Sequence, residues 1–325
     1  MNVLVTGANG LLGHHVIFEL MKEKHSIRVI VRNTKSIFFD FSKIEIFQGN
    51  FMNRQNLKQA AKGCDAIIHI AGVTATNLLY FDDYRKINVD GTAMVLKVAN
   101  ELNINTVVYV SSSNTIGFGS EQQPADERLN IEFPFTKSFY ARSKFQAERL
   151  MIEASKLPNK RYVIINPTFM LGAYDSKPSS GKLILMGYNR KLLFIPKGGK
   201  NFVSANDVAK SICNALIQGN NGEKYLASGY NLSFKEYYEI QKQIGNYKQY
   251  IVEMPNFLLI LIGKIGDLLR FSGVRTELCS MNLRQLIIQE YYNNQKAKSE
   301  LNMPQTEVKV AAEEAINWFK ENGMI

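Results

Sequence analysis

The chain has 325 residues, of which 46% are hydrophobic and 21% are charged, a composition that is typical of a globular protein and excludes a disordered one. The formal net charge is +10, but the lysines and arginines are scattered and form no dense run, so we expect no nucleic-acid partner. Cys64, Cys213 and Cys279 are far apart and fit neither a metal site nor a disulfide framework, which predicts no metal and favours a reducing cytoplasm.

The first half of the chain alternates apolar strands with amphipathic helices. In chain order, the pattern predicts strands over residues 2–7, 27–32, 43–50, 65–72, 106–113 and 161–167, and helices over residues 11–23, 54–63, 82–102 and 138–156. Strands that are apolar throughout and separated by helices indicate a parallel sheet covered on both faces. The predicted fold class is therefore α/β, with a doubly wound parallel sheet of the Rossmann type.

The second half mixes shorter elements. After a loop-like stretch over residues 171–182, the pattern predicts helices over 206–219, 233–245, 257–270 and 306–323, and strands over 223–228 and 249–255. These elements indicate a smaller mixed lobe packed on the sheet. We therefore predict an NAD(P)-binding Rossmann domain over residues 1–170 and a substrate-binding lobe over residues 171–325, some segments of which return to the Rossmann sheet.

The sequence predicts no membrane anchor. A glycine motif begins only a few residues after Met1, so we expect no signal peptide and a cytoplasmic location. The most apolar stretch, residues 257–270, is too short to span a bilayer and contains Lys264 and Asp267. We expect no integral membrane segment, and we interpret this stretch as an amphipathic helix of the smaller lobe. A helix that rests on a membrane surface is the alternative.

The glycine motif "VTGANGLLG" lies between the first predicted strand and the first predicted helix. Gly7, Gly10 and Gly13 stand at every third position. Such glycines permit a tight turn, let the backbone approach a diphosphate, and let the helix pack closely on the strand, while the helix N-terminus attracts the negative charge. The motif predicts a dinucleotide site, built from the residues Gly7, Asn9, Gly10, Leu11, Leu12 and Gly13.

The end of the second predicted strand indicates which dinucleotide binds. An acidic residue there favours NAD, whereas an arginine accommodates the 2′-phosphate of NADP. The chain reads "IRVIVRNTKS", with Arg32 at the strand end, Lys35 close behind and no acid. The sequence therefore favours NADP(H), with NAD as the alternative.

A tyrosine and a lysine on the helix over residues 138–156 indicate the chemistry. Tyr140 and Lys144 are four residues apart, so their side chains lie on one face of the helix. An ammonium group beside a phenol lowers the pKa of the phenol, and such a tyrosine can exchange a proton with a carbonyl oxygen or an alcohol. The fifth strand ends in Ser111, Ser112 and Ser113, and any of these hydroxyl groups could hold the substrate oxygen.

The motifs together resemble one family. "TGANGLLG", "DAIIHIAG", "INVDGT", "YVSSS", "YARSK" and "NPTFMLG" occur in the order seen in extended short-chain dehydrogenase/reductases, the NAD-dependent epimerase/dehydratase superfamily. The similarity covers the first half and continues through "NFVSANDVAKSICNAL". The stretch "INPTFMLGAYDSKPSSG" is more similar to dihydroflavonol-reductase-like members than to galactose epimerases.

The resemblance implies roles for individual residues. It makes Ser113 the catalytic serine, Tyr140 the proton donor or acceptor, and Lys144 a ligand of the nicotinamide ribose as well. It places further cofactor contacts at Asn50, Phe51, Ile70, Ala71, Gly72, Pro167 and Thr168, although the family often has an aspartate where Asn50 stands. Residues near the reacting centre that could contact substrate are Ser112, Asn114, Thr115 and Tyr174. Relatives often pair through the helices that contain Asn88 and Tyr140, which implies a homodimer by analogy.

The substrate is less well indicated. Sugar-nucleotide epimerases of this family usually carry an arginine just before the segment that reads "GGKNFVSANDV" here, where Lys200 and Asn201 stand instead. Together with Arg32, this departure favours NADP(H)-dependent reduction of an aldehyde or ketone. The alternatives are a sugar-nucleotide epimerase or dehydratase with tightly bound NAD, and a dinucleotide-sensing regulator without activity. The presence of the serine, the tyrosine and the lysine argues against the regulator.

Overall fold

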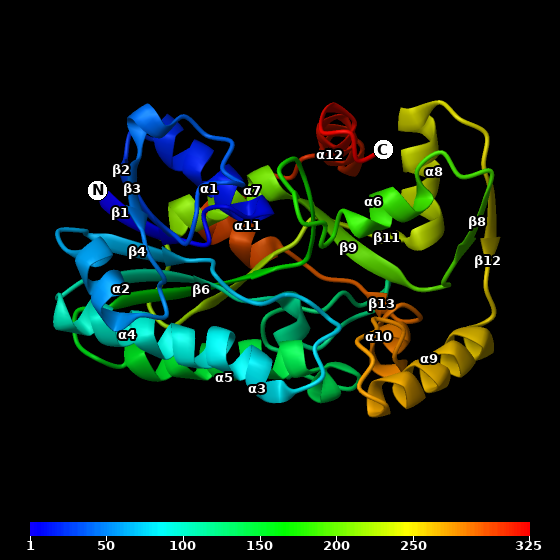
Figure 1. The fold of residues 1–325 in the computed structure, drawn as a ribbon, viewed down its shortest axis with the longest axis horizontal. Helices are drawn as coiled ribbons and strands as arrows, with labels where there is room; N and C mark the ends of the chain where they lie inside the picture. Colours follow the sequence, from blue (N-terminus) through cyan, green and yellow to red (C-terminus); the bar gives the residue numbers. More distant parts are fainter.

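A seven-stranded parallel sheet forms the centre of the molecule (Figure 1). The structure, a computed structural model, describes residues 1–325, with the side chains of all of them except Phe41. The strand order is β10-β6-β5-β4-β1-β2-β3, and every neighbouring pair in it is parallel. The doubly wound α/β fold class that the sequence predicts is confirmed.

The first half of the chain supplies six of these strands. Its main elements are β1 (Asn2–Thr6), α1 (Leu11–Lys22), β2 (Ser26–Val31), β3 (Glu45–Gln48), α2 (Arg54–Ala61), β4 (Ala66–His69), α3 (Phe81–Tyr84), α4 (Asp90–Glu101), β5 (Thr106–Val110), α5 (Phe139–Ser155) and β6 (Arg161–Pro167). A π-helical segment, Arg85–Val89, joins α3 to α4, and a short 3-10 turn, Ser113–Thr115, follows β5.

The second half supplies smaller elements and one more strand of the main sheet. They are β7 (Phe169–Leu171), α6 (Lys182–Gly187), β8 (Leu192–Ile195), β9 (Gly199–Ser204), α7 (Ala205–Ala215), β10 (Lys224–Ala227), β11 (Tyr230–Ser233), α8 (Phe234–Gly245), β12 (Tyr250–Glu253), α9 (Asn256–Phe271), α10 (Ser280–Gln285), β13 (Gln289–Glu290), α11 (Gln295–Leu301) and α12 (Val308–Glu321).

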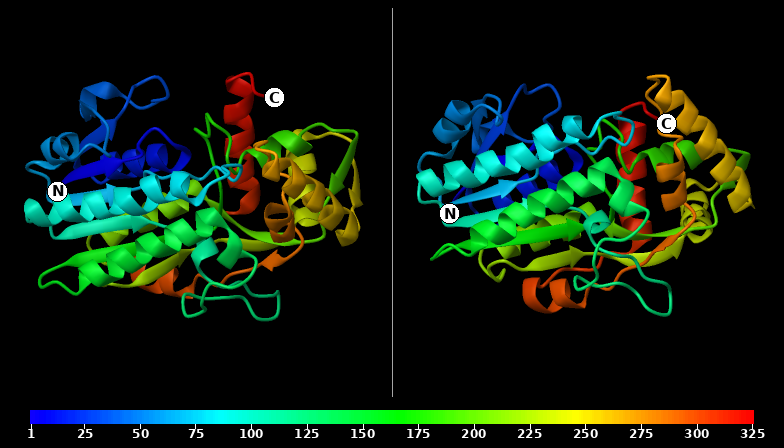
Figure 2. Two further views of the ribbon diagram at one scale, coloured as in Figure 1. Left: turned by 60° about the horizontal axis from the view of Figure 1, so that its bottom comes forward. Right: turned by 90° about the horizontal axis from the view of Figure 1, so that it is seen from below.

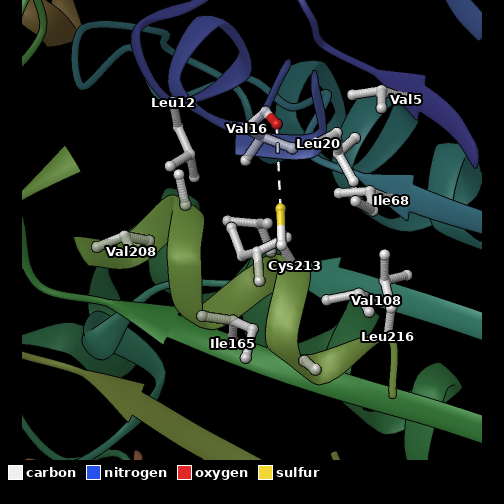
Figure 3. Close-up of a cluster of buried hydrophobic side chains, with 14 of the residues drawn as sticks. Val5, Leu12, Val16, Leu20, Ile68, Val108, Ile165, Val208, Cys213 and Leu216 are labelled. Carbon is white, nitrogen blue, oxygen red and sulfur yellow. Dashed lines mark hydrogen bonds between the residues drawn. The ribbon is translucent and has the colours of Figure 1, made fainter. Parts of the chain in front are cut away.

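Apolar side chains alternate between the two faces of the main sheet and bury a core on each. Val3 and Val5 of β1 face α1, α7 and α11, whereas Leu4 between them faces α2, α4 and α5. Figure 2 shows α4 and α5 side by side over the second face. In the first core, shown in Figure 3, the Cys213 thiol of α7 points at the backbone carbonyl of Val16 in α1.

The strand order reverses next to β1. The chain runs outward from β1 to β3 and then returns to the other side of β1 with β4, so β1 lies between β2 and β4. Thr6 at the end of β1 is paired with both Ile30 and His69. The carboxyl ends of these strands therefore meet where open α/β sheets bind their ligands.

The smaller elements form two further sheets. β9 pairs with β7, β11 and β13, and β12 pairs with β8. Although they follow residue 170, β10 pairs with β6, and α7 and α11 cover the main sheet. The division of the chain into two units near residue 170 stays a prediction. No helix in the described part of the chain has both the length and the apolar character needed to cross a membrane.

Candidate active site

The three glycines after β1 have three different surroundings. Gly7 has φ +78°, and a Cβ there would lie 2.6 Å from the backbone nitrogen of Ala71. A Cβ on Gly13 would lie 2.3 Å from the carbonyl oxygen of Gly7, so α1 rests directly on the turn. On Gly10 the nearest atom to a Cβ is the Gly7 carbonyl oxygen at 3.7 Å, so this side of the turn is open. The turn is tight inside and open outside, as a diphosphate site requires.

The N-terminus of α1 faces this open side. Gly10 is the N-cap residue of α1 and has no side chain to cap the helix, so the backbone N–H groups of the first turn remain available to an anion. Leu12 packs into the core and Leu11 is also buried, so these two predicted residues would act through their backbone. The arrangement fits the diphosphate of a nicotinamide dinucleotide.

His14 supplies no positive charge to this turn. It is buried, its Nδ1 lies 2.8 Å from the Gly10 carbonyl oxygen, and its Nε2 accepts a hydrogen bond from the Phe38 N–H. Nδ1 is therefore the protonated nitrogen of a neutral ring, and burial lowers the pKa of His14 to about 4. Tyr174, a predicted substrate contact, has φ +70° and stacks on His14 with ring centres 5.0 Å apart. The Tyr174 ring therefore packs against α1, and Tyr174 is not among the residues that surround Tyr140.

The predicted adenosine contacts lie on the other side of the turn. Arg32 follows β2 directly and is exposed, and it has no carboxylate partner among the described side chains. Asn50 follows β3 and is also exposed, but its side-chain oxygen accepts a hydrogen bond from the Met52 N–H at 3.1 Å. The centres of the Phe51 and His69 rings lie 5.7 Å apart. Arg32 is thus free to meet a 2′-phosphate, whereas part of the Asn50 side chain is used in its own turn.

Asn88 fixes the segment after β4, which contains Ile70, Ala71 and Gly72. The Asn88 side chain accepts a hydrogen bond from the Val73 N–H at 2.7 Å and donates to the Val73 carbonyl at 3.1 Å. It also donates to the Ser143 hydroxyl on α5 at 2.9 Å. Asn88 lies in the π-helical segment, a local distortion that often marks functional sites. This residue therefore ties the β4 end of the cofactor site to the helix that carries Tyr140.

Lys144 is buried between β5 and the segment after β4. Its ammonium donates to the Val110 carbonyl at 2.8 Å and lies 4.9 Å from the centre of the Tyr109 ring. A Cβ on Gly72 would lie 3.2 Å from this nitrogen. Burial lowers the pKa of Lys144 to about 8, although the nearby Glu148 acts in the opposite direction.

Tyr140 lines a cavity of about 470 Å³. The pKa of Tyr140 is raised by burial, and a side-chain hydrogen bond with Ser112 acts in the opposite direction. Burial is the larger effect, so the pKa of Tyr140 lies above its usual value, while the Lys144 ammonium donates to the Val110 carbonyl. Tyr140 is therefore protonated at neutral pH, as a proton donor must be.

The three serines after β5 have different surroundings. The Ser112 side-chain oxygen accepts a hydrogen bond from the Asn114 N–H at 3.2 Å, and an interaction with the Ser112 side chain lowers the pKa of Tyr140. Ser113 acts in the same direction on the pKa of Tyr292, whose buried phenol oxygen has no hydrogen-bond partner among the described side chains. The Ser111 hydroxyl is also buried without such a partner. Which of the three serines serves Tyr140 stays a prediction.

Glu148 stabilises the segment after β5 that contains the three serines. It is not one of the site residues predicted from the sequence. It is buried, and its carboxylate accepts hydrogen bonds of 2.6 Å from the Thr115 hydroxyl and from the Asn166 side chain. Asn166 also donates to the Ser112 carbonyl at 3.0 Å. Thr115, a predicted substrate contact, is 1% exposed and its hydroxyl is used in this network. Glu148 follows Lys144 by four residues, as Lys144 follows Tyr140, and that spacing is the signal in the sequence.

The remaining predicted residues lie at the edge of the site. Pro167 ends β6, and Thr168 is buried, with its hydroxyl donating to the Asn201 side chain at 2.7 Å. Asn114 is partly exposed beside Ser113, and its N–H donates to the Ser112 hydroxyl at 3.2 Å. Among the described side chains, no group of three His, Cys, Asp or Glu residues is placed to hold a metal ion.

The wall of the cavity beside Tyr140 combines apolar and polar side chains from both halves of the chain. Leu78 comes from the loop before α3, Phe139 from α5, and Phe271 from α9. Arg270 also lines the cavity, and its guanidinium donates to the Leu78 carbonyl at 2.6 Å. The other polar and charged residues of the wall include Thr76, Lys137, Ser138, Asp267 and Asn282. Tyr140 therefore borders a space with both an apolar and a charged part.

Lys200 and Glu290 form a buried ion pair between β9 and β13. Both side chains are nearly inaccessible, and the Lys200 ammonium donates directly to the Glu290 carboxylate. Burial raises the pKa of Glu290, and the adjacent ammonium acts in the opposite direction. The positive charge of Lys200 is therefore balanced within the chain.

Comparison with known proteins agrees with this geometry. The sequence model of the NAD dependent epimerase/dehydratase family matches residues 3–229. A protein of Synechocystis sp. named as a dihydroflavonol 4-reductase is 27% identical, covering 99% of this chain and 95% of its own. The sterol demethylase protein B of Methylococcus capsulatus is 26% identical over the whole of both chains. The crystal structure of gox2253 has a TM-score of 0.83 and 26% identity, covering 99% of each chain.

A more distant solved structure shows how widely the fold is shared. The Thermus thermophilus UDP-glucose 4-epimerase in complex with NAD has a TM-score of 0.78 at 15% identity, over 98% of this chain and 99% of that one. The family model covers more than two thirds of this chain, and reductases and dehydrogenases are among the relatives. The chain is an NAD(P)-dependent enzyme of the extended short-chain dehydrogenase/reductase type and belongs to the NAD dependent epimerase/dehydratase family.

Proposed function

We propose that this enzyme uses NADP(H) to reduce an aldehyde or ketone group on an apolar molecule. One observation carries the proposal: Tyr140 lines a cavity whose wall includes the apolar side chains of Leu78 and Phe271. An interaction with the Ser112 side chain also acts on the pKa of the Tyr140 phenol. The glycine turn and the helix N-terminus that fit a diphosphate are at the same edge of the sheet. Proton donor, substrate space and cofactor site are thereby adjacent.

In this proposal the protein holds the carbonyl oxygen and supplies the proton. A bound nicotinamide dinucleotide supplies the hydride. Tyr140, which is protonated at neutral pH, gives its proton to the carbonyl oxygen, and Ser112 keeps the phenol in place. Ser113 is one residue further along and stays a candidate for polarising the carbonyl, as the resemblance implies. Lys144 holds the backbone of β5 and the ribose side of the site.

The buried ion pair supports a reductase over a sugar-nucleotide epimerase. An epimerase has to hold the diphosphate of its substrate, and Lys200 would be the residue to do so. Because Glu290 neutralises Lys200, a diphosphate there would meet a buried carboxylate as well. Several relatives carry names of enzymes with apolar substrates, among them a farnesyl-dihydroquinoline-oxide ketoreductase and sterol-4-alpha-carboxylate 3-dehydrogenases. These names support an apolar substrate for this chain.

A substrate screen tests the proposed activity. We expect NADPH oxidation with apolar ketones or aldehydes, and no epimerisation of UDP-glucose. We also expect UDP to bind with a Kd above about 1 mM, because the Glu290 carboxylate balances the charge of Lys200. Calorimetric titration of UDP measures the second point independently of turnover. Micromolar UDP binding, or NAD that survives dialysis of the purified protein, would favour the epimerase.

The cofactor preference rests on Arg32. Replacing Arg32 with aspartate is expected to raise the Kd of NADPH at least about tenfold, because a charge-assisted hydrogen bond to the 2′-phosphate is lost. The Kd of NADH should change less than about threefold. Fluorescence titration of both cofactors measures the two values. Lys62→Asp, at an exposed position before the start of β4, is the control for net charge and should leave both values unchanged. Equal weakening of NADPH and NADH would contradict the assignment.

Two further predictions from the sequence, the substrate lobe and the homodimer, remain proposals. We propose that the segments after residue 170 that lie outside the main sheet form the substrate lobe, because Arg270, Phe271 and Met281 line the cavity beside Tyr140. A homodimer that pairs through the helices near Asn88 and Tyr140 rests on analogy with relatives.

A further inference from the structure

Helix α9 presents its large apolar side chains outward and its small residues inward. Its buried residues are Leu259, Gly263 and Gly266. A Cβ on Gly263 would lie 2.7 Å from the Cα of Ser280, and one on Gly266 would lie 1.6 Å from the Leu278 carbonyl oxygen. The helix therefore packs closely on α10 and the loop before it through its two glycines, and Leu259 is its one large buried side chain. An ordinary surface helix does the opposite and buries its large apolar residues.

The outward side of α9 and the loop after it form a continuous apolar set, which we call the α9 face. It consists of Phe257, Leu258, Leu261, Ile262, Ile265, Leu268, Leu269, Phe271, Val274 and Leu278, all of them exposed. Leu268 is 72% exposed and Phe271 94% exposed, so these side chains have almost no cover within the chain. Exposed apolar patches of this size mark interaction sites.

A second exposed apolar set lies at the same end of the molecule. β8 and β12 pair side by side, with Leu192 opposite Tyr250 and Phe194 opposite Val252, and all four side chains are exposed. The chain passes from β12 into α9 after only two residues, and Figure 1 shows all three elements at one end of the fold. The apolar surface is therefore larger than α9 alone.

Positive charges accompany this surface. The segments 190–197 and 248–278 carry seven cations and three carboxylates, namely Arg190, Lys191, Lys197, Lys248, Lys264, Arg270 and Arg275 against Glu253, Asp267 and Glu277. Glu277 is paired with Lys182. Arg270 donates to two backbone carbonyls, and Asp267 accepts from the Ser280 N–H. The other six cations have no carboxylate partner among the described side chains. The apolar surface thus has a positively charged rim.

We propose that the α9 face docks on the surface of an anionic lipid bilayer. An interfacial helix places apolar side chains among the acyl chains and needs cations at the level of anionic headgroups, and α9 offers both. A second copy of the chain fits less well. A two-fold contact would put the cations of this rim on both sides of the interface with few carboxylates to offset them, and an excess of like charge opposes association.

Docking would place the cavity beside Tyr140 at the lipid. Arg270, Phe271 and Gly273, at the end of α9, are part of the cavity wall. An apolar carbonyl compound could then pass from the bilayer to the Tyr140 hydroxyl without crossing water. This consequence rests on the proposed function, whereas the docking itself rests only on exposure and charge.

Vesicle cosedimentation tests the docking without any turnover. We expect the wild-type protein to bind vesicles of phosphatidylcholine with ~30% phosphatidylglycerol at least about tenfold more tightly than vesicles of phosphatidylcholine alone. The variant Phe257→Gln/Leu261→Gln/Ile265→Gln/Leu268→Gln should lose at least about tenfold of this binding. Lys264→Glu/Arg275→Glu should lose the preference for the anionic vesicles.

The matched control is Ile217→Gln/Val310→Gln, which removes exposed aliphatic side chains from α12 and the end of α7 and should bind like the wild type. Thermal unfolding of each variant shows whether it is folded. Absence of wild-type binding to the anionic vesicles, or equal binding by the fourfold α9 variant, would overturn the proposal. A dimer in sedimentation velocity that the fourfold variant abolishes, without vesicle binding, would identify a second copy as the occupant instead. An inactive protein that still binds vesicles would refute the proposed function and leave the docking intact.

Discussion

Replacing Tyr140 with phenylalanine is expected to lower kcat for carbonyl reduction by about 10²–10⁴-fold, the range typical for loss of a positioned proton donor. The change removes one oxygen atom and leaves the ring that lines the cavity. The Kd of NADPH should therefore stay within about twofold of the wild-type value, because the diphosphate site is formed elsewhere, by the glycine turn. Steady-state kinetics and a cofactor titration measure the two quantities.

The control for this prediction is Tyr80→Phe. Tyr80 lines the same cavity, but its side chain is 69% exposed and belongs to the loop before α3. This variant should keep kcat within about threefold of the wild type. Turnover by Tyr140→Phe at the wild-type rate would remove Tyr140 from the mechanism.

Two serine variants decide which hydroxyl serves Tyr140. The hydrogen bond with Ser112 lowers the pKa of Tyr140, so Ser112→Ala should raise that pKa. Reduction requires the protonated phenol and is lost above its pKa, so the alkaline limb of the kcat/KM profile should move to higher pH. Ser113→Ala should leave this limb in place, because Ser113 acts on the pKa of Tyr292 and not on that of Tyr140. The opposite pattern would return the role to Ser113.

Replacing Gly7 with alanine is expected to destabilise the fold by about 2–5 kcal/mol. A positive φ costs an alanine ~1–2 kcal/mol, and forcing a methyl group into a packed site costs ~1–3 kcal/mol more. Both apply, since Gly7 has φ +78° and its Cβ would lie 2.6 Å from the Ala71 nitrogen. The same shift would separate β1 from the segment after β4, so dinucleotide binding should be lost even where the variant folds. Urea unfolding and a cofactor titration measure the two effects.

Gly63→Ala separates the two causes. Gly63 has φ +79°, almost the same as Gly7, but a Cβ there would have no atom within 4 Å. This variant should therefore show only the conformational part, ~1–2 kcal/mol, and should bind the dinucleotide normally. A loss of stability in Gly7→Ala no larger than that in Gly63→Ala would show that the turn can yield to a methyl group.

The sequence predicts the main sheet well because its elements are set by local pattern. The helix predicted over residues 138–156 is Phe139–Ser155, and the strand predicted over residues 161–167 has those bounds in the structure. Both elements are long and strongly patterned. Four-residue spacing places Tyr140 and Lys144 on one face of α5 without reference to any other segment.

Long-range contacts explain what the sequence does not reveal. β9 is buried along its whole length and pairs with strands from three different parts of the chain, so its composition has no alternation to detect. The last helix, predicted from residue 306, begins at Val308, because Thr306 donates to the Asp207 side chain instead of capping the helix. The serines also differ in their relation to Tyr140, Tyr292 and Glu148, which are distant from them in sequence.

The path of the chain between the main sheet and the smaller elements has a mechanical consequence. After β6 the chain leaves for β7, returns with α7 and β10, leaves again with β11, and returns with α11. A fragment ending at residue 170 would expose an unpaired edge on β6 and leave the face of α1 that packs on α7 in water. Several crossings also oppose hinge bending, because a rotation would have to flex every connection together. The enzyme should therefore admit its substrate by local movement at the rim of the cavity rather than by a hinge motion between the main sheet and the smaller elements.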